Sequence, residues 1–209
     1  MVTKKFSMKS NLIYIIKNIK KAKLNAPVYK FQSLDYNKYN KFITTFLSSR
    51  TRDEVTYKAS YNLISKADSL EKLRLLDVET IENLIKPVAF YRVKAINLKK
   101  ISKLDDIPTS LNELLRLPGV GVKIAKVFLA KLGMPYIGVD VHVHRILNRI
   151  GILETKYVEE TDKIINEIVP NEIKPDFNRE IVALGQTICK AKNPKCEICP
   201  INKVCKKLL

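Results

Sequence analysis

Four cysteines near the C-terminus, Cys189, Cys196, Cys199 and Cys205, are the residues with the most recognisable chemistry. Disulfides would be expected in a small secreted domain, but this chain is longer, is expected to carry no signal peptide and has no cysteine before Cys189, which favours metal ligation. Four thiolates so close in sequence can hold a tetrahedral zinc ion or a 4Fe–4S cluster. Their chemistry alone does not distinguish the two.

A lysine and an aspartate form a second candidate pair. Lys123 follows a glycine-containing turn and lies in the first turn of an expected helix, where the helix dipole disfavours the ammonium form. A partly neutral amine can attack a carbonyl-like carbon and form a Schiff base. Asp140 is the one carboxylate between Glu113 and Glu154 and can accept a proton or stabilise positive charge on a sugar. A solvated surface lysine and a helix N-cap are the alternatives.

The turn itself, LPGVG at residues 117–121, is typical of a helix-hairpin-helix motif. Pro118 ends the preceding helix, while Gly119 and Gly121 permit backbone angles and close approaches that a side chain would forbid. Backbone N–H groups at such a turn can bind a phosphate without reading base sequence. We therefore expect Pro118, Gly119, Val120 and Gly121 to contact DNA; a plain turn between packed helices is the alternative.

The composition supports a nucleic-acid partner. The 209 residues are 46% hydrophobic and 28% charged, as in folded proteins, and are enough for one large or two small domains. A formal net charge of +17 indicates a polyanionic partner, more often nucleic acid than an acidic membrane surface. Every apolar run is broken by charge before it could span a bilayer, so we expect no membrane association and an intracellular protein.

The elements that must position these residues are predicted to be helices, because apolar residues recur at helical spacing between proline and glycine breaks. The expected helices are residues 9–24, 38–49, 53–66, 69–75, 79–86, 88–102, 110–117, 121–131, 158–169 and 175–189. Ser69 and Thr80 are expected at helix starts.

Residues 135–147 are ambiguous. Alternating polarity favours a strand over 136–144, but an isolated strand has no partner to pair with. We prefer an extended segment ending at Asp140, which then caps a helix from Val141 to about Ile150.

Three motifs, in this order, resemble the endonuclease III branch of the helix-hairpin-helix (HhH-GPD) DNA glycosylase superfamily. They are LPGVGVK at 117–123, VDVH at 139–142 and the C-x6-C-x2-C-x5-C loop, and the similarity runs from about residue 38 to the end. The resemblance implies an all-α fold of two helical domains flanking a DNA-binding groove. A helical barrel with the hairpin would span 36–133, and residues 1–35 plus 134–209 would form the domain with the cluster loop. It also selects the 4Fe–4S cluster, bound by the four cysteines.

The same resemblance implies a bifunctional DNA glycosylase and AP lyase of base excision repair that removes oxidised pyrimidines from duplex DNA. Lys123 would attack C1′, expel the base and form an imine, and β-elimination would then cut the strand on the 3′ side. Asp140 would activate the lysine and stabilise the oxocarbenium-like sugar. The implied partner is double-stranded DNA with damaged bases or abasic sites, bound by a monomer that works in the cytoplasm at the nucleoid.

The resemblance also places residues near the displaced base, which must leave the stack to be reached. Arg50 and Phe90 match positions where the family commonly has glutamine and a branched aliphatic residue; Arg50 would hydrogen-bond the orphaned base and Phe90 would stack. A core position is the alternative for Phe90. His142 matches a residue near the lesion, with a helix-surface histidine as the alternative.

Two further departures bear on the substrate range. Val122 replaces a common basic residue, and the segment from Lys123 to Asp140 is about one residue shorter than in typical members. The alternatives to the leading function are a mismatch-specific DNA glycosylase of the same fold and a non-catalytic DNA-binding or redox-sensing module.

Overall fold

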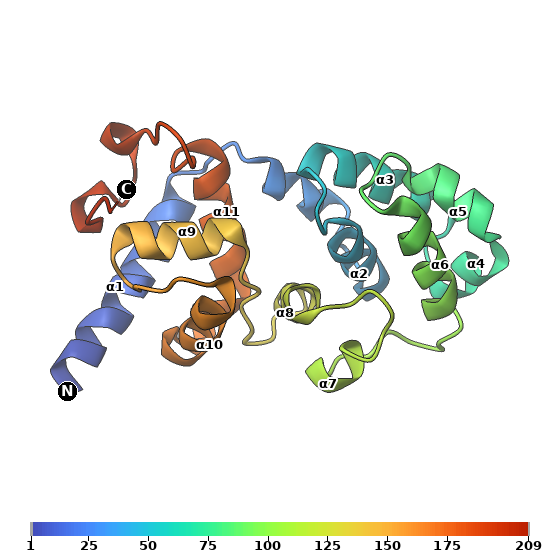
Figure 1. The fold of residues 1–209 in the computed structure, drawn as a ribbon, viewed down its shortest axis with the longest axis horizontal. Coiled ribbons are helices and arrows are strands. Elements are labelled where there is room, and N and C mark those ends of the chain that lie inside the picture. The colour runs from blue at the N-terminus through green and yellow to red at the C-terminus, as the bar shows by residue number, and fades with distance from the viewer. Residues whose placement is uncertain (1, 209) are drawn as a thin grey trace. The chain divides into compact units, whose positions relative to one another are not determined.

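A computed structural model describes the chain from residue 2 to residue 208, with side chains from Lys9 onwards. This described part is helical throughout and contains no strand (Figure 1), which confirms the predicted all-α class. No helix in it is long and apolar enough to cross a membrane. The chain divides into two compact units, Met1–Tyr29 with Gly133–Leu209, and Lys30–Leu132. The domain boundaries at residues 36 and 133 stay a prediction.

The unit of residues 30–132 is built from seven helices around an aromatic centre. They are α2 (Lys38–Leu47), α3 (Asp53–Lys66), α4 (Leu70–Leu75), α5 (Val78–Ile85), α6 (Tyr91–Ile101), α7 (Leu111–Leu114) and α8 (Val122–Lys131). Helix α2 packs against α3 and α8, and α6 packs against α4 and α5. The ring of Phe42 lies 5.7 Å from that of Phe46 and 5.4 Å, edge-on, from that of Phe128. These buried rings join α8 to α2.

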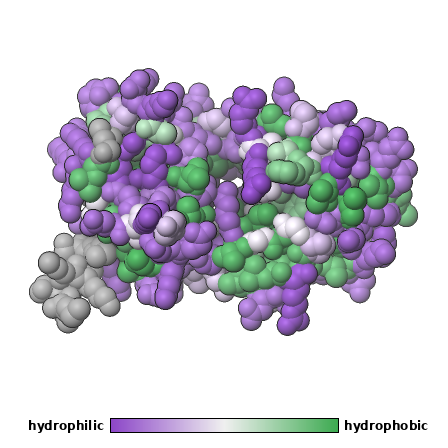
Figure 2. Space-filling view, viewed as in Figure 1, coloured by the Kyte–Doolittle hydropathy of each residue, from purple (hydrophilic) through white to green (hydrophobic). Residues whose placement is uncertain are grey.

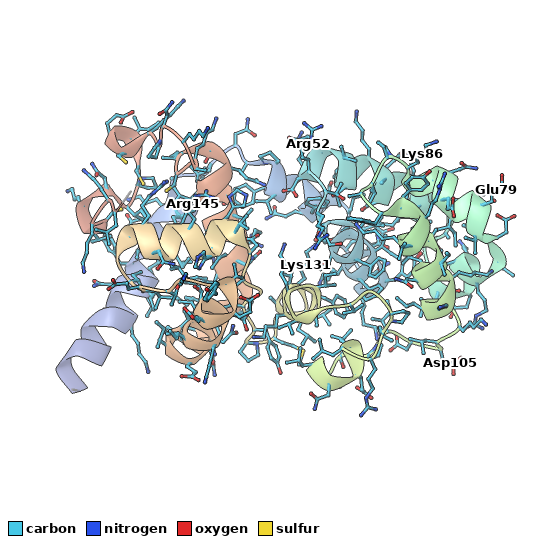
Figure 3. The ribbon with its side chains drawn as sticks, viewed as in Figure 1. Arg52, Glu79, Lys86, Asp105, Lys131 and Arg145 are labelled. Carbon is cyan, nitrogen blue, oxygen red and sulfur yellow. The ribbon has the colours of Figure 1, made fainter. Side chains whose placement is uncertain are left out.

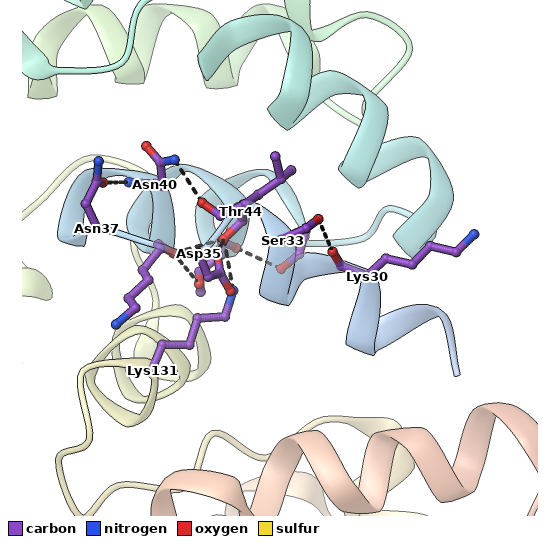
Figure 4. A network of polar contacts seen from close by, with 11 residues as sticks. Lys30, Ser33, Asp35, Asn37, Asn40, Thr44 and Lys131 are labelled. Atoms are coloured by element: carbon purple, nitrogen blue, oxygen red, sulfur yellow. Dashed lines mark hydrogen bonds and ion pairs between the residues drawn. The ribbon is translucent and has the colours of Figure 1, made fainter. Parts of the chain in front are cut away.

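A polar network fixes the C-terminal end of α8 (Figure 4). The Lys131 ammonium lies 2.7 Å from Asp35 Oδ2 and donates to Thr44 Oγ1 at 2.9 Å, while Thr44 donates to Asp35 Oδ1 at 2.6 Å. Burial lowers the pKa of Lys131, and the Asp35 carboxylate opposes that shift by stabilising the charged form. The helix that carries Lys123 is therefore anchored at its far end as well as along its packed face.

The other unit has α11 at its centre (Figure 1). Its helices are α1 (Val2–Lys21), α9 (Val141–Ile150), α10 (Val158–Ile168) and α11 (Lys174–Thr187), with 3₁₀ turns η2 (Asn171–Ile173), η3 (Cys196–Ile198) and η4 (Asn202–Val204). A further 3₁₀ turn, η1 (Pro27–Ser33), spans the point where the two units divide. Helices α1 and α9 pack against α11, and α10 packs against α9. The predicted N-terminal amphipathic helix is confirmed, since Leu12, Ile16 and Ile19 lie in the core.

Two helix starts show which capping predictions hold. Ser69 caps α4 as expected, accepting a bond from Lys72 N. Thr80 was wrong as a helix start: α5 begins at Val78, and the Asp77 side chain accepts from Thr80 N at 2.6 Å. A carboxylate three residues earlier satisfies that N–H group better than a hydroxyl can.

Candidate active site

The backbone conformation of the hairpin requires glycine at one of its two glycine positions. Gly119 has φ +80°, and a Cβ there would lie 2.7 Å from Asn97 Nδ2 and 3.3 Å from the Phe46 ring. Gly121 has an ordinary φ of −94°, and a Cβ would meet nothing within 4 Å in the described structure. The expected special backbone angle is therefore confirmed at Gly119 and wrong at Gly121, while the close approach expected at Gly121 stays a prediction. Buried Val120 anchors the turn between them.

Helix α8 begins at this turn without a side-chain cap. Gly121 is its N-cap residue, and within the described residues no side chain bonds to the cap position. The first N–H groups of a helix have no partner inside the helix, so they face outward beside the positive end of its dipole. Lys123, the second residue of α8, is exposed at this end. The hairpin thus places a cationic amine next to a backbone site suited to an anion.

Asp140 is the N-cap of α9, as preferred from the sequence. Its Oδ1 accepts from His142 N and Val143 N, both at 2.9 Å, and residue 140 is extended (φ −120°, ψ −176°). The alternative strand over 136–144 is wrong, because the segment pairs with side chains instead of with another strand. These bonds fix the orientation of a half-buried carboxylate.

Two asparagines hold the segment that leads to Asp140. Asn166 bonds both backbone groups of Ile137, accepting from its N–H at 2.9 Å and donating to its carbonyl at 3.0 Å. Asn178 donates to the Gly138 carbonyl at 2.6 Å. The carboxylate therefore follows a backbone that α10 and α11 fix in place.

His142 packs against α11 at a glycine. It is half-buried, and a Cβ on Gly185 would lie 2.5 Å from its Nδ1. The Arg145 guanidinium (Figure 3) lies 3.3 Å from the same nitrogen and donates to the Cys189 carbonyl at 2.9 Å. The plain surface reading of His142 is thus wrong, because its ring sits between α9 and α11 with an arginine neighbour.

Arg50 and Phe90 lie together on the surface of the other unit. The Arg50 guanidinium carbon lies 5.5 Å from the centre of the Phe90 ring, a cation–π arrangement. Phe90 is 60% exposed, so its alternative as a core residue is wrong. Both residues have a left-handed backbone conformation, with φ 55° for Arg50 and 58° for Phe90. Such conformations are uncommon away from glycine and cost about 1–3 kcal/mol unless the surroundings impose them.

Lys94 is a buried residue near this pair that the sequence analysis did not identify. Its ammonium donates to the carbonyls of Leu47 and Ser49, each at 2.8 Å. Burial lowers its pKa to about 8. It follows no recognisable motif in a lysine-rich helix, so its burial was not evident from the sequence.

The four cysteines line one cavity in their unit, together with Arg149 and residues of α9 and α11. Among the described residues, no three histidine, cysteine or carboxylate groups lie close enough to hold a single metal ion. A zinc ion needs all its sulfurs at about 2.3 Å, whereas a 4Fe–4S cluster spreads four thiolates over four irons. Four cysteine thiols around a shared cavity are a donor set that suits the cluster.

The surroundings of the sulfurs also suit a cluster. Arg149 donates to Cys189 Sγ at 3.5 Å, and the Lys207 N–H donates to Cys205 Sγ at 3.4 Å. Donors to ligand sulfurs stabilise anionic thiolates and are part of how proteins tune such centres. Arg149 also donates to the carbonyls of Lys190 and Ala191, at 2.7 and 3.2 Å, so one buried arginine holds the start of the loop.

Comparison with known proteins agrees with this geometry. Residues 43–171 match the HhH-GPD superfamily of base excision DNA repair proteins, and residues 189–205 match the iron–sulfur binding domain of endonuclease III. Endonuclease III of Thermotoga maritima is 39% identical over 170 residues, which cover 78% of this chain and 80% of the relative. The endonuclease III homolog of Encephalitozoon cuniculi is 37% identical over 186 residues, covering 80% and 78%.

Solved structures show the same relationship. A non-covalent endonuclease III–DNA complex superposes with a TM-score of 0.80 at 27% identity, covering 95% of each chain. A thermostable thymine-DNA glycosylase, at 22% identity and a TM-score of 0.79 over 99% and 97% of the chains, shares the fold. Together with the hairpin and the cysteine loop, these matches place the chain in the endonuclease III family of the HhH-GPD superfamily: it is a base excision repair DNA glycosylase and AP lyase that carries a 4Fe–4S cluster.

Proposed function

We propose that this enzyme removes oxidised pyrimidines from duplex DNA through a Schiff base on Lys123. The observation that carries the proposal is the position of Lys123, exposed in the first turn of a helix that begins at an uncapped glycine turn. In a family of glycosylases with lyase activity, an amine beside a phosphate-binding turn is suited to attack a sugar carbon.

The proposed reaction uses two side chains. Lys123 Nζ forms a bond to C1′ as the bond from C1′ to the base breaks, and opening of the sugar ring gives the imine. Loss of a proton from C2′ then breaks the C3′–O bond and cuts the strand. Asp140 accepts a proton from the lysine and stabilises the positive charge that develops on the sugar. Its orientation is already set by the two N–H bonds to Oδ1.

The backbone contacts belong to the hairpin. We expect a phosphate beside the N–H groups at the start of α8, with Pro118, Gly119 and Val120 shaping the turn and Gly121 leaving room for close approach. Figure 2 shows hydrophobic side chains gathered around α8, and Leu115 and Val122 on either side of the turn are exposed. Val122 supplies apolar contact where a basic residue would supply charge.

Arg50, Phe90 and His142 are proposed to contact DNA near the lesion. The side chains of Arg50 and Phe90 are exposed and lie against each other, and both residues have left-handed backbone conformations. These features suit residues that enter the space left by a displaced base. Guanidinium N–H groups donate hydrogen bonds to base acceptors, and the Phe90 ring stacks on a neighbouring base. His142 lies in the first turn of α9, two residues after Asp140.

The cluster is proposed to bind Cys189, Cys196, Cys199 and Cys205. When bound, it joins four thiolates and so fixes a segment whose regular structure is otherwise only two single turns, η3 and η4. Lys190, Lys192, Lys195 and Lys203 of this segment would add positive charge for the DNA backbone.

The partner and setting follow from the same proposal. We expect a monomer that binds duplex DNA with damaged bases or abasic sites, at the nucleoid inside the cell. Affinity should fall steeply with salt because lysine contacts release counterions. A flat salt response would contradict backbone binding, and light scattering of the DNA complex tests the monomer.

Borohydride trapping on abasic duplex DNA tests the proposed nucleophile. The parent enzyme should form a covalent complex, and Lys123→Ala should not. Lys126→Ala, on the same helix, is the matched control and should trap like the parent. Trapping by Lys123→Ala at the parent level would show that another amine does the chemistry.

The substrate class needs a separate measurement. On duplexes with one defined base each, release of thymine glycol should be faster than release of undamaged thymine opposite guanine. The reverse order would indicate a mismatch-specific enzyme.

A further inference from the structure

Arg50 and Phe90 are held together by bonds next to each of them. On one side, Lys94 reaches from α6 to the carbonyls of Leu47, the last residue of α2, and Ser49, the residue before Arg50, at 2.8 Å each. Lys94 is itself bonded to the Phe90 carbonyl through its backbone N–H at 3.0 Å. One side chain therefore joins the helix that starts after Phe90 to the segment that ends at Arg50.

A second bond closes the arrangement from the other side. Thr51 Oγ1 accepts from the Ala89 N–H at 3.1 Å. Thr51 follows Arg50 directly, and Ala89 precedes Phe90 directly, so this bond ties the two loops at the opposite flank. The guanidinium of Arg50 over the Phe90 ring is the third link. Arg50 and Phe90, which both have left-handed backbone conformations, are thus flanked by hydrogen-bonded residues on both sides.

We propose that Lys94 is a positioning residue that sets Arg50 and Phe90 as one rigid pair before DNA binds. A charged ammonium buried against carbonyl oxygens costs desolvation, so its presence is not explained by stability alone. The buried ammonium instead fixes the backbone conformation of two strained residues. DNA binding then does not have to order them, which reduces its cost in conformational entropy. The inference rests on the proposed role of Arg50 and Phe90.

The chain offers a matched control on the same helix. Lys99 also donates to two carbonyls, those of Arg74 and Leu76, each at 2.6 Å, but it ties α6 to the end of α4. Lys94→Met and Lys99→Met remove the same chemical group and the same number of bonds from one helix. A merely structural role for Lys94, the more buried of the two, predicts a larger loss of stability in Lys94→Met and no selective loss of base release.

The readout is base release under single turnover at saturating enzyme, alongside strand cleavage of a preformed abasic site. Loss of positioning can slow a reaction by about tenfold to a hundredfold, and we expect this for thymine glycol release by Lys94→Met. Cleavage at the abasic site should slow less, by about threefold, because no base has to be unstacked. Lys99→Met should leave both rates within about twofold of the parent.

A fluorescent 2-aminopurine placed opposite an abasic site reports entry of the pair directly. The parent and Lys99→Met should change its emission on binding, and Lys94→Met should lose most of that change.

Thr51→Val is a milder variant for use if Lys94→Met folds poorly, because it removes only the bond between Thr51 and Ala89. It should slow base release by about threefold and leave abasic-site cleavage unchanged.

Two failures are distinguishable. If Arg50→Ala and Phe90→Ala slow base release while Lys94→Met and Thr51→Val match Lys99→Met, the positioning role of Lys94 is wrong and the proposed DNA contact of Arg50 and Phe90 stands. If Arg50→Ala and Phe90→Ala leave base release unchanged, the proposed contact of that pair with DNA is wrong.

Discussion

The hairpin at the start of α8 and the cysteine loop at the end of the chain are both irregular segments, but they are held by different means. The hairpin is fixed by protein atoms alone, since Gly119 packs on Asn97 and the Phe46 ring. The cysteine loop has two single 3₁₀ turns and bonds from Arg149 and Arg145. We therefore expect the second segment, and not the first, to depend on a cofactor for a defined structure.

The arginines extend that dependence to α9. Arg145 and Arg149 lie on the helix that Asp140 caps, and both bond to backbone of the cysteine loop. Helix α8, in contrast, is fixed by Phe128 and by the Lys131 network. The two proposed catalytic residues should therefore respond differently when the cluster is lost.

The largest expected effect comes from removing a cluster ligand. Cys199→Ser should lower the iron content and increase hydrogen exchange over residues 189–205, and then over α9, because Arg149 loses a fixed partner. Exchange in α2 and α8 should stay near the parent level. Equal loss of protection in α8 and α9 would contradict the comparison.

Substitutions at the two hairpin glycines give the next largest expected effect and test how the hairpin is held. Gly119→Ala should destabilise the protein by about 2–4 kcal/mol, because its φ is positive and its Cβ would meet Asn97. Gly121→Ala should change stability by less than about 0.5 kcal/mol yet weaken DNA binding by about tenfold. Urea unfolding and DNA titration measure the two effects. Equal stability losses in both variants would remove the distinction.

Gly185→Ala tests the packing beneath His142. Alanine is preferred over glycine inside a helix by about 1 kcal/mol, so α11 alone predicts stabilisation. A Cβ at 2.5 Å from His142 Nδ1 and 3.0 Å from Ile146 Cδ1 should reverse the sign, giving a loss of about 1 kcal/mol. A higher melting temperature for the variant would show that His142 moves away freely.

The smallest effect is a pH dependence in the unit that needs no cofactor. Burial lowers the pKa of Lys94 from 10.5 to about 8, so the unfolded chain binds more protons than the folded one between those values. Stability contributed by this site should therefore rise with pH, by about 1 kcal/mol from about pH 8 to about pH 9.5. Subtracting the same measurement on Lys94→Met isolates the site. Parallel stability curves for the two proteins would contradict the buried ammonium.

The helices and the cap could be predicted from sequence because their causes are local. Apolar spacing marked the buried faces of α1, α3 and α8, and Asp140 before a helical pattern marked the start of α9. The cysteine spacing and the hairpin were recognisable for the same reason. Their order along the chain identified the family.

Contacts between residues distant in sequence were not predictable in this way. Nothing local indicates that Lys94 is buried or that Arg50 lies over Phe90, because both facts depend on how α2 and α6 pack. Arg149 lies among the apolar positions of α9. A charged residue at such a position was the one sequence signal that it is buried and bonds to the cysteine loop. The open space at Gly121 depends on atoms that surround the turn rather than on its sequence.

The central claim, that Lys123 is the nucleophile, is tested most directly by locating the reduced adduct. Protease digestion of the borohydride-trapped DNA complex, followed by mass spectrometry of the peptides, identifies the lysine that carries the sugar remnant. We expect the modification on Lys123 and on no other residue of α8. An adduct on Lys126, or at the N-terminal amine, would contradict the account.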